Sequence, residues 1–411
     1  MWEITLRCDL GCKHCGSRAG KARTSELTTA ECFDLARQLA DVGVREVVLI
    51  GGEAYLRDDW HLIAGEITRL GMICGMATGA RSLTAERISQ ATDAGMRSIS
   101  ISLDGLEASH DAQRGVKGSW RAAVDACSRV AASPIRLTTN SQVNRISLPE
   151  LPALADLLVE VGSRAWQVQL SVAMGRAADR PDLLLQPYEL LELFPLLVWI
   201  QQEKLRPKGI LLFPGNNVGY FGPYEHELRY GGEDGAHWGG CPAGQWAMGV
   251  EADGQIKGCP SLPTSVYGGG SVRETRLAEI IANAPELRVI RERTIADLWG
   301  FCRTCYYADT CMGGCTWTAH SLLGRAGNNP YCIHRATELE AQGLRERIVK
   351  VEAAPGLPFD HGRYELALEP LPPPGETPSV GGVPLNRLMA LGPKSGGAWT
   401  KAELDERLRP R

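Results

Sequence analysis

Cysteine spacing is the feature that most constrains this chain of 411 residues. Ten of its thirteen cysteines fall into two groups, three within eight residues near the N-terminus and seven between residues 241 and 332. Disulfide frameworks are typical of short secreted chains. This chain is long, and Glu3, Arg7 and Asp9 stand where a signal peptide needs an apolar core. The grouping therefore predicts metal or metal-cluster ligands in two separate regions.

Charge and hydropathy exclude several function classes. The 44 Lys and Arg residues nearly balance the 48 Asp and Glu residues, which leaves a net charge of -4. A nucleic-acid or membrane-surface binder normally shows a basic excess or patch. No uninterrupted apolar run reaches the roughly 18–20 residues of a membrane span. We expect a soluble, cytoplasmic protein without nucleic-acid or membrane partners.

The first two hundred residues alternate short apolar strands with amphipathic helices. Strands are expected at 3–6, 46–50, 72–78, 98–103, 135–139 and 165–173, and helices at 28–42, 58–70, 84–94, 119–132 and 148–161. This alternation indicates an α/β fold with a parallel sheet. Six such units predict a partial (β/α)6 TIM barrel, whose chemistry lies at the carboxyl ends of its strands.

Composition divides the chain into four expected parts. The barrel should cover 1–205, a connector rich in Gly, Pro, Tyr and Phe 206–240, and a small metal-dependent domain 241–350. The connector is expected to be structured, with a flexible linker as the alternative. The Pro- and Gly-rich tail, 351–411, is expected to be extended or disordered, with a short helix near 400–408.

Cys8, Cys12 and Cys15 form a CxxxCxxC run directly after the first expected strand. Three thiolates can hold three irons of a 4Fe–4S cluster and leave the fourth iron open for chemistry. The alternative is structural zinc, which needs four ligands. His14 lies inside the loop, where it cannot easily fold back to be the fourth. The run therefore favours an iron–sulfur cluster with an open site.

A second motif follows the second strand, where Gly51, Gly52 and Glu53 precede Ala54. Together with the cysteine run it resembles the radical SAM superfamily, in which the fourth motif residue is proline. The resemblance implies that S-adenosylmethionine (SAM) binds the open iron and is reductively cleaved to a 5′-deoxyadenosyl radical. It implies that carbonyl groups of the glycine motif accept from the SAM amino group, and that His14 lies near the adenine.

Ser102, Asp104, His110 and Arg114 belong to a stretch that resembles the SxDG, HD and RG motifs of radical SAM peptide maturases. The resemblance implies that Ser102 contacts SAM and that Arg114 binds its carboxylate, for which a guanidinium is a suitable partner. It also implies that Asn140, at the end of the fifth strand, lies near SAM. Plain structural roles are the alternatives. Weaker candidates for the same site are Gln169 and Arg176.

The C-terminal cysteines form a longer pattern that resembles the seven-cysteine SPASM module, which carries auxiliary 4Fe–4S clusters. Its members are Cys241, Cys259, Cys302, Cys305, Cys311, Cys315 and Cys332. Residues 252–255 predict a hairpin turn between the first two of them. A zinc ribbon is the alternative, but Cys302 and Cys305 have no CxxC partner. Including the triad, the resemblance implies three 4Fe–4S clusters.

The resemblance also implies how these seven ligands divide. One auxiliary cluster would take four thiolates, and the other would take three and keep an open site or a non-cysteine ligand. The four are Cys302, Cys305, Cys311 and Cys332; the three are Cys241, Cys259 and Cys315. The remaining cysteines, Cys32, Cys74 and Cys127, are expected to pack as small apolar side chains.

The closest resemblance is to SPASM peptide maturases, including the mycofactocin type. It implies a ribosomally made precursor peptide as substrate, oxidative modification such as crosslinking, and a flavodoxin- or ferredoxin-type electron donor. Leader recognition is expected from a separate protein, the second domain or the tail. A base must remove a proton after hydrogen abstraction. The candidates are Tyr224, Asp234 and Tyr307, followed by Tyr220, Glu225 and Tyr306.

Several alternatives stay open at this point. Within the family they are sulfatase-maturase-type oxidation of a Cys or Ser side chain and radical peptide epimerisation. From other classes they are a non-catalytic iron–sulfur electron carrier and a zinc-stabilised binding module. An open iron beside a SAM-binding motif argues against both of the non-catalytic readings.

Overall fold

A ten-stranded, mostly parallel sheet organises the computed structural model, which describes residues 1–229 and 237–372. Its strand order is β10-β9-β8-β1-β2-β3-β4-β5-β6-β7, and every neighbouring pair from β8–β1 to β6–β7 is parallel. The first seven strands are β1 (Trp2–Glu3), β2 (Glu46–Ile50), β3 (Ile73–Thr78), β4 (Ser98–Ser102), β5 (Arg136–Val143), β6 (Ala165–Leu170) and β7 (Leu211–Pro214). The predicted partial barrel is confirmed.

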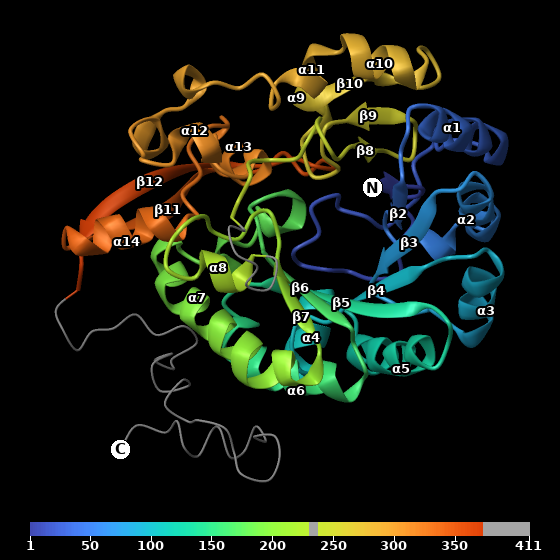
Figure 1. The fold of residues 1–411 in the computed structure, drawn as a ribbon, viewed down its shortest axis with the longest axis horizontal. Coiled ribbons are helices and arrows are strands. Elements are labelled where there is room, and N and C mark those ends of the chain that lie inside the picture. Colours follow the sequence, from blue (N-terminus) through green and yellow to red (C-terminus); the bar gives the residue numbers. More distant parts are fainter. Residues whose placement is uncertain (230–236, 373–411) are drawn as a thin grey trace.

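Helices cover the outer face of the curved sheet (Figure 1). They are α1 (Thr29–Asp41), α2 (Trp60–Arg69), α3 (Ala85–Asp93), α5 (Ser119–Ala131), α6 (Leu151–Glu160) and α7 (Leu190–Trp199). Helix α4 (Glu107–Arg114) instead follows β4 and bonds the loop after β1 through the carbonyls of Gln113 and Arg114. Capping residues fix the N-termini of two helices. At α1, Thr28 forms a capping box with Glu31, and at α3 the side chain of Thr84 accepts from the backbone amide of Arg87. Apolar faces of the helices pack on the sheet in one continuous core.

Within the barrel, two helices and one strand were not predicted. Helix α4 is short and polar and has no side-chain cap, and α7 contains Pro195. The helical stretch Pro181–Lys208 meets the length and composition of a membrane span, but most of its apolar window is buried inside the protein. Strand β7 lies within the segment expected as a connector, so that expectation is wrong for these four residues.

The C-terminal region joins the barrel through the same sheet. Strand β8 (Gly249–Val250) pairs in parallel with β1 and antiparallel with β9 (Gln255–Lys257), which confirms the predicted hairpin. β10 (Gly268–Ser271) completes the edge. The helices are α8 (Glu225–Leu228), α9 (Thr264–Tyr267), α10 (Leu277–Asn283), α11 (Pro285–Arg288), α12 (Ala308–Cys311), α13 (Thr316–Leu323) and α14 (Ile333–Ala341).

A second sheet follows the last cysteine. Strands β11 (Leu344–Glu352) and β12 (Arg363–Pro370) form an antiparallel hairpin, so the expectation of an extended tail from residue 351 is wrong up to residue 370. The hairpin forms because Ile348 and Tyr364 bury their side chains against the rest of the protein. The expected helix at 400–408 lies outside the described residues.

Candidate active site and cysteine groups

The loop between β1 and α1 carries the three N-terminal cysteines. Backbone amides donate to the sulfur of Cys8 at 3.4 Å and to the sulfur of Cys15 at 3.3 Å. The guanidinium of Arg114 donates to Cys12 Sγ at 3.6 Å. Hydrogen bonds to sulfur stabilise thiolates and tune the potential of an iron–sulfur cluster. Each sulfur therefore has one N–H donor, which fits an anionic cluster held by three thiolates.

Two of the free thiols of this loop, Cys8 and Cys12, are held in the protonated form. Burial, together with the nearby Glu53, raises the pKa of Cys8 to about 12. Burial also raises the pKa of Cys12 to about 11, against the effect of Arg114. Metal binding would therefore release protons from the loop, as thiolate ligation requires.

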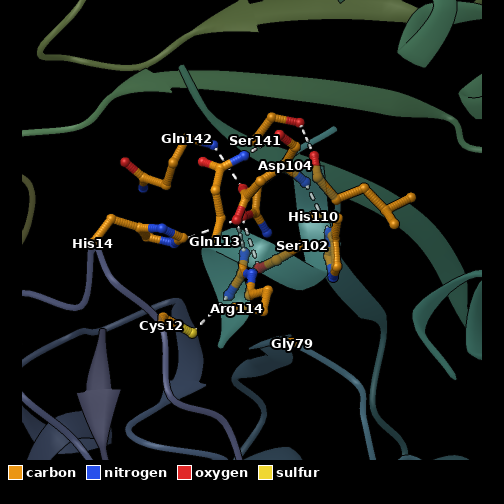
Figure 2. Close-up of polar contacts among 12 residues, drawn as sticks. Cys12, His14, Gly79, Ser102, Asp104, His110, Gln113, Arg114, Ser141 and Gln142 are labelled. Carbon is orange, nitrogen blue, oxygen red and sulfur yellow. Dashed lines mark hydrogen bonds and ion pairs between the residues drawn. The ribbon is translucent and has the colours of Figure 1, made fainter. Parts of the chain in front are cut away.

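Asp104 is the centre of a buried polar network beside the triad (Figure 2). Its Oδ2 atom lies 2.7 Å from Arg114 Nη2 and 3.3 Å from His14 Nε2, and the backbone of Gln142 donates to Oδ1 at 2.9 Å. Burial favours the neutral acid, but Arg114 and the histidines hold the pKa of Asp104 below its usual value. Asp104 thus fixes the guanidinium that contacts Cys12.

His14 and Glu53 are also buried around the triad. Burial lowers the pKa of His14 to about 4, so the ring is neutral, and its Nδ1 atom has no hydrogen-bond partner among the described residues. Burial raises the pKa of Glu53 to about 7, although Thr78 and the amide of Gly79 donate to it. An unpartnered ring nitrogen beside the triad is suited to a ligand such as an adenine.

The glycine motif packs directly on the segment that follows β1. Gly51 has φ +152°, and a Cβ atom there would collide with the carbonyl oxygen of Thr5. A Cβ atom on Gly52 would collide with the carbonyl oxygen of Arg7. Only glycine lets the backbone after β2 pass this close to residues 5–7, which follow β1.

A cavity of about 460 Å³ lies between the barrel and the C-terminal region. His14 and Gly51 line its barrel side. Three cysteines from the C-terminal region line it as well: Cys241, Cys259 and Cys315. Five side-chain amides also face it, namely Gln142, Gln167, Gln169, Asn216 and Asn217. One space therefore borders both the triad loop and one group of C-terminal cysteines.

The other four C-terminal cysteines line a separate small cavity: Cys302, Cys305, Cys311 and Cys332. Tyr220 lies between the two groups. Its hydroxyl accepts from the amide of Cys315 at 2.9 Å and from Asn329 Nδ2 at 3.1 Å. Its carbonyl accepts from Cys332 Sγ at 3.5 Å. The structure thus places three of the seven cysteines at one cavity and four at another, and the division of these ligands between two clusters stays a prediction.

The expected SAM contacts take different positions. His14 and Gly51 line the cavity, whereas Gly52, Glu53, Ser102, Arg114 and Asn140 do not. Ser102 Oγ donates to Asn140 Oδ1 at 3.0 Å across β4 and β5. Arg114 was expected to bind the SAM carboxylate, but its guanidinium contacts Asp104 and Cys12 instead.

Two of the three expected bases, Tyr224 and Tyr307, are not among the residues that line this cavity. Tyr224 packs beside Phe194, with ring centroids 6.4 Å apart. Tyr307 stacks on Phe221 at 4.2 Å, next to the four-cysteine cavity. Asp234 lies outside the described residues. Neither tyrosine lines the cavity that borders the triad loop.

Sequence reasoning missed two carboxylates that line the cavity, Glu3 and Glu251. Arg23 Nη2 lies 3.0 Å from Glu3 Oε1 and 3.2 Å from Glu251 Oε2, and Lys257 Nζ lies 2.7 Å from Glu251 Oε1. Burial raises the pKa of Glu3 to about 7. No local motif marks these residues, because they meet only through the β1–β8 pairing.

Two family models match this chain, one in its N-terminal part and one in its C-terminal part. Residues 2–159 match the family model of the radical SAM superfamily, and residues 241–306 match that of the SPASM iron–sulfur cluster-binding domain. The chain carries a radical SAM domain and a SPASM domain. The resemblance drawn from the sequence is confirmed. The radical SAM domain implies SAM and a 4Fe–4S cluster, and the SPASM domain indicates further iron–sulfur clusters.

Relatives of this radical SAM–SPASM chain differ in their named activities. It is 28% identical to an AdoMet-dependent heme synthase of Methanosarcina barkeri over 81% of this chain and 95% of that one. It is 27% identical to a PqqA peptide cyclase of Rhizobium meliloti, over 80% and 85%. It is also 27% identical to the mycofactocin maturase MftC of Mycobacterium tuberculosis, over 90% of each chain.

A solved structure shares the fold. Streptococcus suis SuiB bound to its precursor peptide SuiA superposes with a TM-score of 0.60 at 17% identity, covering 80% of this chain and 73% of that one. At this identity the likeness supports the architecture alone.

Proposed function

We propose that the protein reductively cleaves SAM and uses the resulting radical to modify a ribosomally made precursor peptide oxidatively, most simply by a crosslink. One observation carries this proposal. The cavity of about 460 Å³ is bordered by the triad loop and by Cys241, Cys259 and Cys315. A peptide segment bound there would lie between the radical source and an auxiliary cluster.

The cavity lining favours a peptide as the substrate class. Five residues with side-chain amides line it, and such an amide can offer both a donor and an acceptor to a peptide backbone. The amide of Asn217 is already engaged, because both of its polar atoms bond the backbone of Leu170. Gln169 and Gln167 bond to each other, since Gln169 Nε2 donates to Gln167 Oε1 at 2.9 Å. The peptide cyclase among the relatives supports the same class.

The heme synthase relatives suggest a tetrapyrrole as the competing substrate. A haem carries propionate carboxylates, which bind best beside cationic groups. The described residues that line this cavity include no Lys or Arg, and the cations nearest to its carboxylates, Arg23 and Lys257, are already paired with Glu3 and Glu251. The electrostatics of the lining therefore favour the peptide.

Residues of this chain have distinct roles in the proposal. Cys8, Cys12 and Cys15 would hold the cluster whose reduction supplies the 5′-deoxyadenosyl radical from SAM. Seven C-terminal cysteines would hold two auxiliary clusters. Glu3 is suited to accept the proton that the substrate loses, because it lines the cavity and has a pKa near neutrality.

The first test is anaerobic incubation of the reconstituted protein with SAM and dithionite. We expect 5′-deoxyadenosine from the wild-type protein and none from Cys12→Ala. Cys127→Ala is the matched control, because Cys127 is buried on α5 away from both cysteine groups. Failure of the cluster-loaded wild-type protein to form 5′-deoxyadenosine would refute the proposed chemistry.

The second test is the mass of the short peptide encoded beside the gene, after co-expression with the enzyme. Loss of two hydrogen atoms mapped to two side chains supports a crosslink. A change confined to one Cys or Ser supports sulfatase-maturase-type oxidation. A mass that is unchanged in ordinary water, together with the gain of one deuterium in heavy water, supports epimerisation. An unmodified peptide together with decarboxylation of a tetrapyrrole would overturn the peptide proposal.

A further inference from the structure

The C-terminal hairpin returns to the triad loop. Strands β11 and β12 lie beyond residues 241–306, the part that matches the SPASM model, and their connecting loop covers residues 353–362. The amide of Phe359 donates to the carbonyl of Gly16 at 3.1 Å, and the amide of Gly175 donates to the carbonyl of Asp360 at 2.7 Å. The hairpin loop therefore contacts both the triad loop and the turn after β6.

Asp360 provides the strongest of these contacts. Its carboxylate accepts from Arg18 Nε at 2.8 Å, and its side chain is only 6% exposed. The amides of Gly356 and Leu357 also donate to it, which fixes the carboxylate within its own loop. Arg18 also donates two hydrogen bonds to Asp179, at 2.6 and 2.9 Å, but that side chain is 45% exposed to solvent. The buried ion pair to Asp360 should therefore contribute more than the exposed one.

Arg18 follows Cys15 by only three residues and itself adopts a left-handed backbone conformation, with φ 49°. The amide of Arg18 donates to the carbonyl of Cys15, and the amide of Arg176 donates to the same oxygen at 3.0 Å. Fixing the Arg18 guanidinium thus restrains the loop segment that presents the third cysteine of the triad.

Phe359 faces the reaction cavity and is one of its lining residues. Its ring lies 3.9 Å from Lys257 Nζ, and this ammonium is fully buried and paired with Glu251. Phe359 also has a left-handed backbone, with φ 58°. A bulky residue rarely adopts this conformation, and such strain concentrates at ligand-contacting positions.

We propose that the hairpin loop 353–362 completes the active site, with Asp360 as a positioning residue and Phe359 as a specificity-determining residue. Asp360 acts through Arg18 on the loop that bears Cys15. Phe359 forms a wall of the cavity and contacts the molecule bound there. This inference rests on the proposed function only for the identity of that molecule.

SAM alone tests the role of Asp360. Full-length wild-type protein, Asp360→Asn and the matched control Asp179→Asn are reconstituted anaerobically and titrated with SAM. We expect Asp360→Asn to weaken SAM binding by about tenfold and to change the electron paramagnetic resonance spectrum of the reduced, SAM-bound triad cluster. Asp179→Asn should change the affinity by less than about twofold. Equal effects of the two variants, or no effect of either, would overturn the role of Asp360.

Phe359 is tested by the ratio of 5′-deoxyadenosine formed to peptide modified. We expect Phe359→Ala to raise this ratio at least several-fold and Phe359→Leu to restore much of the coupling. Leu357→Ala is the control, because Leu357 lies in the same loop and is 62% exposed. A ratio for Phe359→Ala equal to that for Leu357→Ala would overturn the role of Phe359.

These two experiments separate the inference from the proposed function. If the wild-type protein binds and cleaves SAM but leaves the peptide unmodified, the peptide proposal fails. The SAM titration of Asp360→Asn then still decides whether the hairpin loop positions the triad. Melting temperature and iron content, measured for every variant, identify those that do not fold. If Asp360→Asn does not fold, the conservative Asp360→Glu variant is titrated instead. It must bind SAM with at least half of the wild-type affinity, or the positioning role is refuted.

Discussion

Arg114 Nη1 lies 3.6 Å from Cys12 Sγ, so a buried guanidinium donates to the middle cysteine of the triad. The same guanidinium is held by Asp104, whose Oδ2 atom lies 2.7 Å from Nη2. Because the ion pair is almost fully buried, Arg114 has little freedom to turn away from the sulfur. One ion pair therefore controls both the position and the electrostatic environment of Cys12.

Replacing Arg114 tests this arrangement. We expect Arg114→Met to lower the free energy of unfolding by about 3–5 kcal/mol, because Asp104 is left buried without its cation. We also expect a more negative midpoint potential of the triad cluster, because a hydrogen bond to a ligating sulfur is lost. Anaerobic denaturant unfolding and redox titration measure the two effects.

A double variant separates the two effects. Arg114→Met combined with Asp104→Asn should recover most of the lost stability, because no unpaired carboxylate remains. The midpoint potential should stay more negative than that of the wild type. A single Arg114→Met variant as stable as the wild type would contradict the importance of the ion pair.

Tyr220 should stabilise the region between the two C-terminal cysteine groups. Its hydroxyl bonds the amide of Cys315, the side chain of Asn329 and the carbonyl of Asn216. We expect Tyr220→Phe to cost about 2–3 kcal/mol, because buried polar groups lose their partner. Tyr306→Phe is the control, because Tyr306 is 87% exposed, and it should change stability by less than about 0.5 kcal/mol. Equal stabilities of the two variants would argue against the network.

Glu3 is expected to act as a base in its ionised form. Since burial raises its pKa to about 7, peptide modification should accelerate as the pH rises from about 6 to about 8. Glu3→Gln should slow modification by about a hundredfold or more while 5′-deoxyadenosine still forms, and Glu3→Asp should keep part of the rate. Rates followed by mass spectrometry across this pH range check the expectation. A Glu3→Gln enzyme with the wild-type rate would assign the proton to another group.

Glu192 should make stability depend on pH. Burial, with help from Glu189, raises the pKa of Glu192 to about 7, and its Oε2 atom is buried without a partner among the described residues. The folded state therefore binds this proton more tightly than the unfolded state, and the contribution to stability is lost as the pH rises from about 4.5 to about 7.

Glu192→Gln should remove this effect. We expect the variant to be more stable than the wild type by about 1–2 kcal/mol near pH 8 and equally stable near pH 4. Glu203→Gln, at an exposed position of the same helical stretch, should change stability by less than about 0.5 kcal/mol at either pH. A pH-independent difference for Glu192→Gln would show that ionisation is not its cause.

Local patterns were enough to predict the barrel and the cysteine groups. Each of the five expected helices has a counterpart, because apolar periodicity and caps such as Thr28 are encoded within a few residues. The hairpin β11–β12 was missed because its strands carry many charges, and few of its side chains, namely Ile348, Tyr364 and in part Leu366, pack on the core. Its pairing depends on tertiary contacts that the local pattern does not reveal.

In the candidate site, too, contiguous motifs could be predicted, whereas contacts between distant residues could not. The triad and the glycine motif are contiguous in the sequence and could be predicted. The partners of Arg114 could not, because Cys12 is 102 residues away along the chain. Glu3 and Glu251 meet only after β8 has paired with β1, and Phe359 reaches the cavity from the far end of the described chain.

The pairing of β1 with β8 has a consequence for biosynthesis. Trp2 pairs with Val250, so β1 must wait for the synthesis of some 250 further residues before its second edge is covered. An uncovered strand edge invites association with other chains. The triad loop follows this strand directly and stays next to an open edge during that interval. Iron–sulfur loading of the N-terminal half before translation has passed β8 would therefore take place on an aggregation-prone nascent chain, which favours cluster insertion after release.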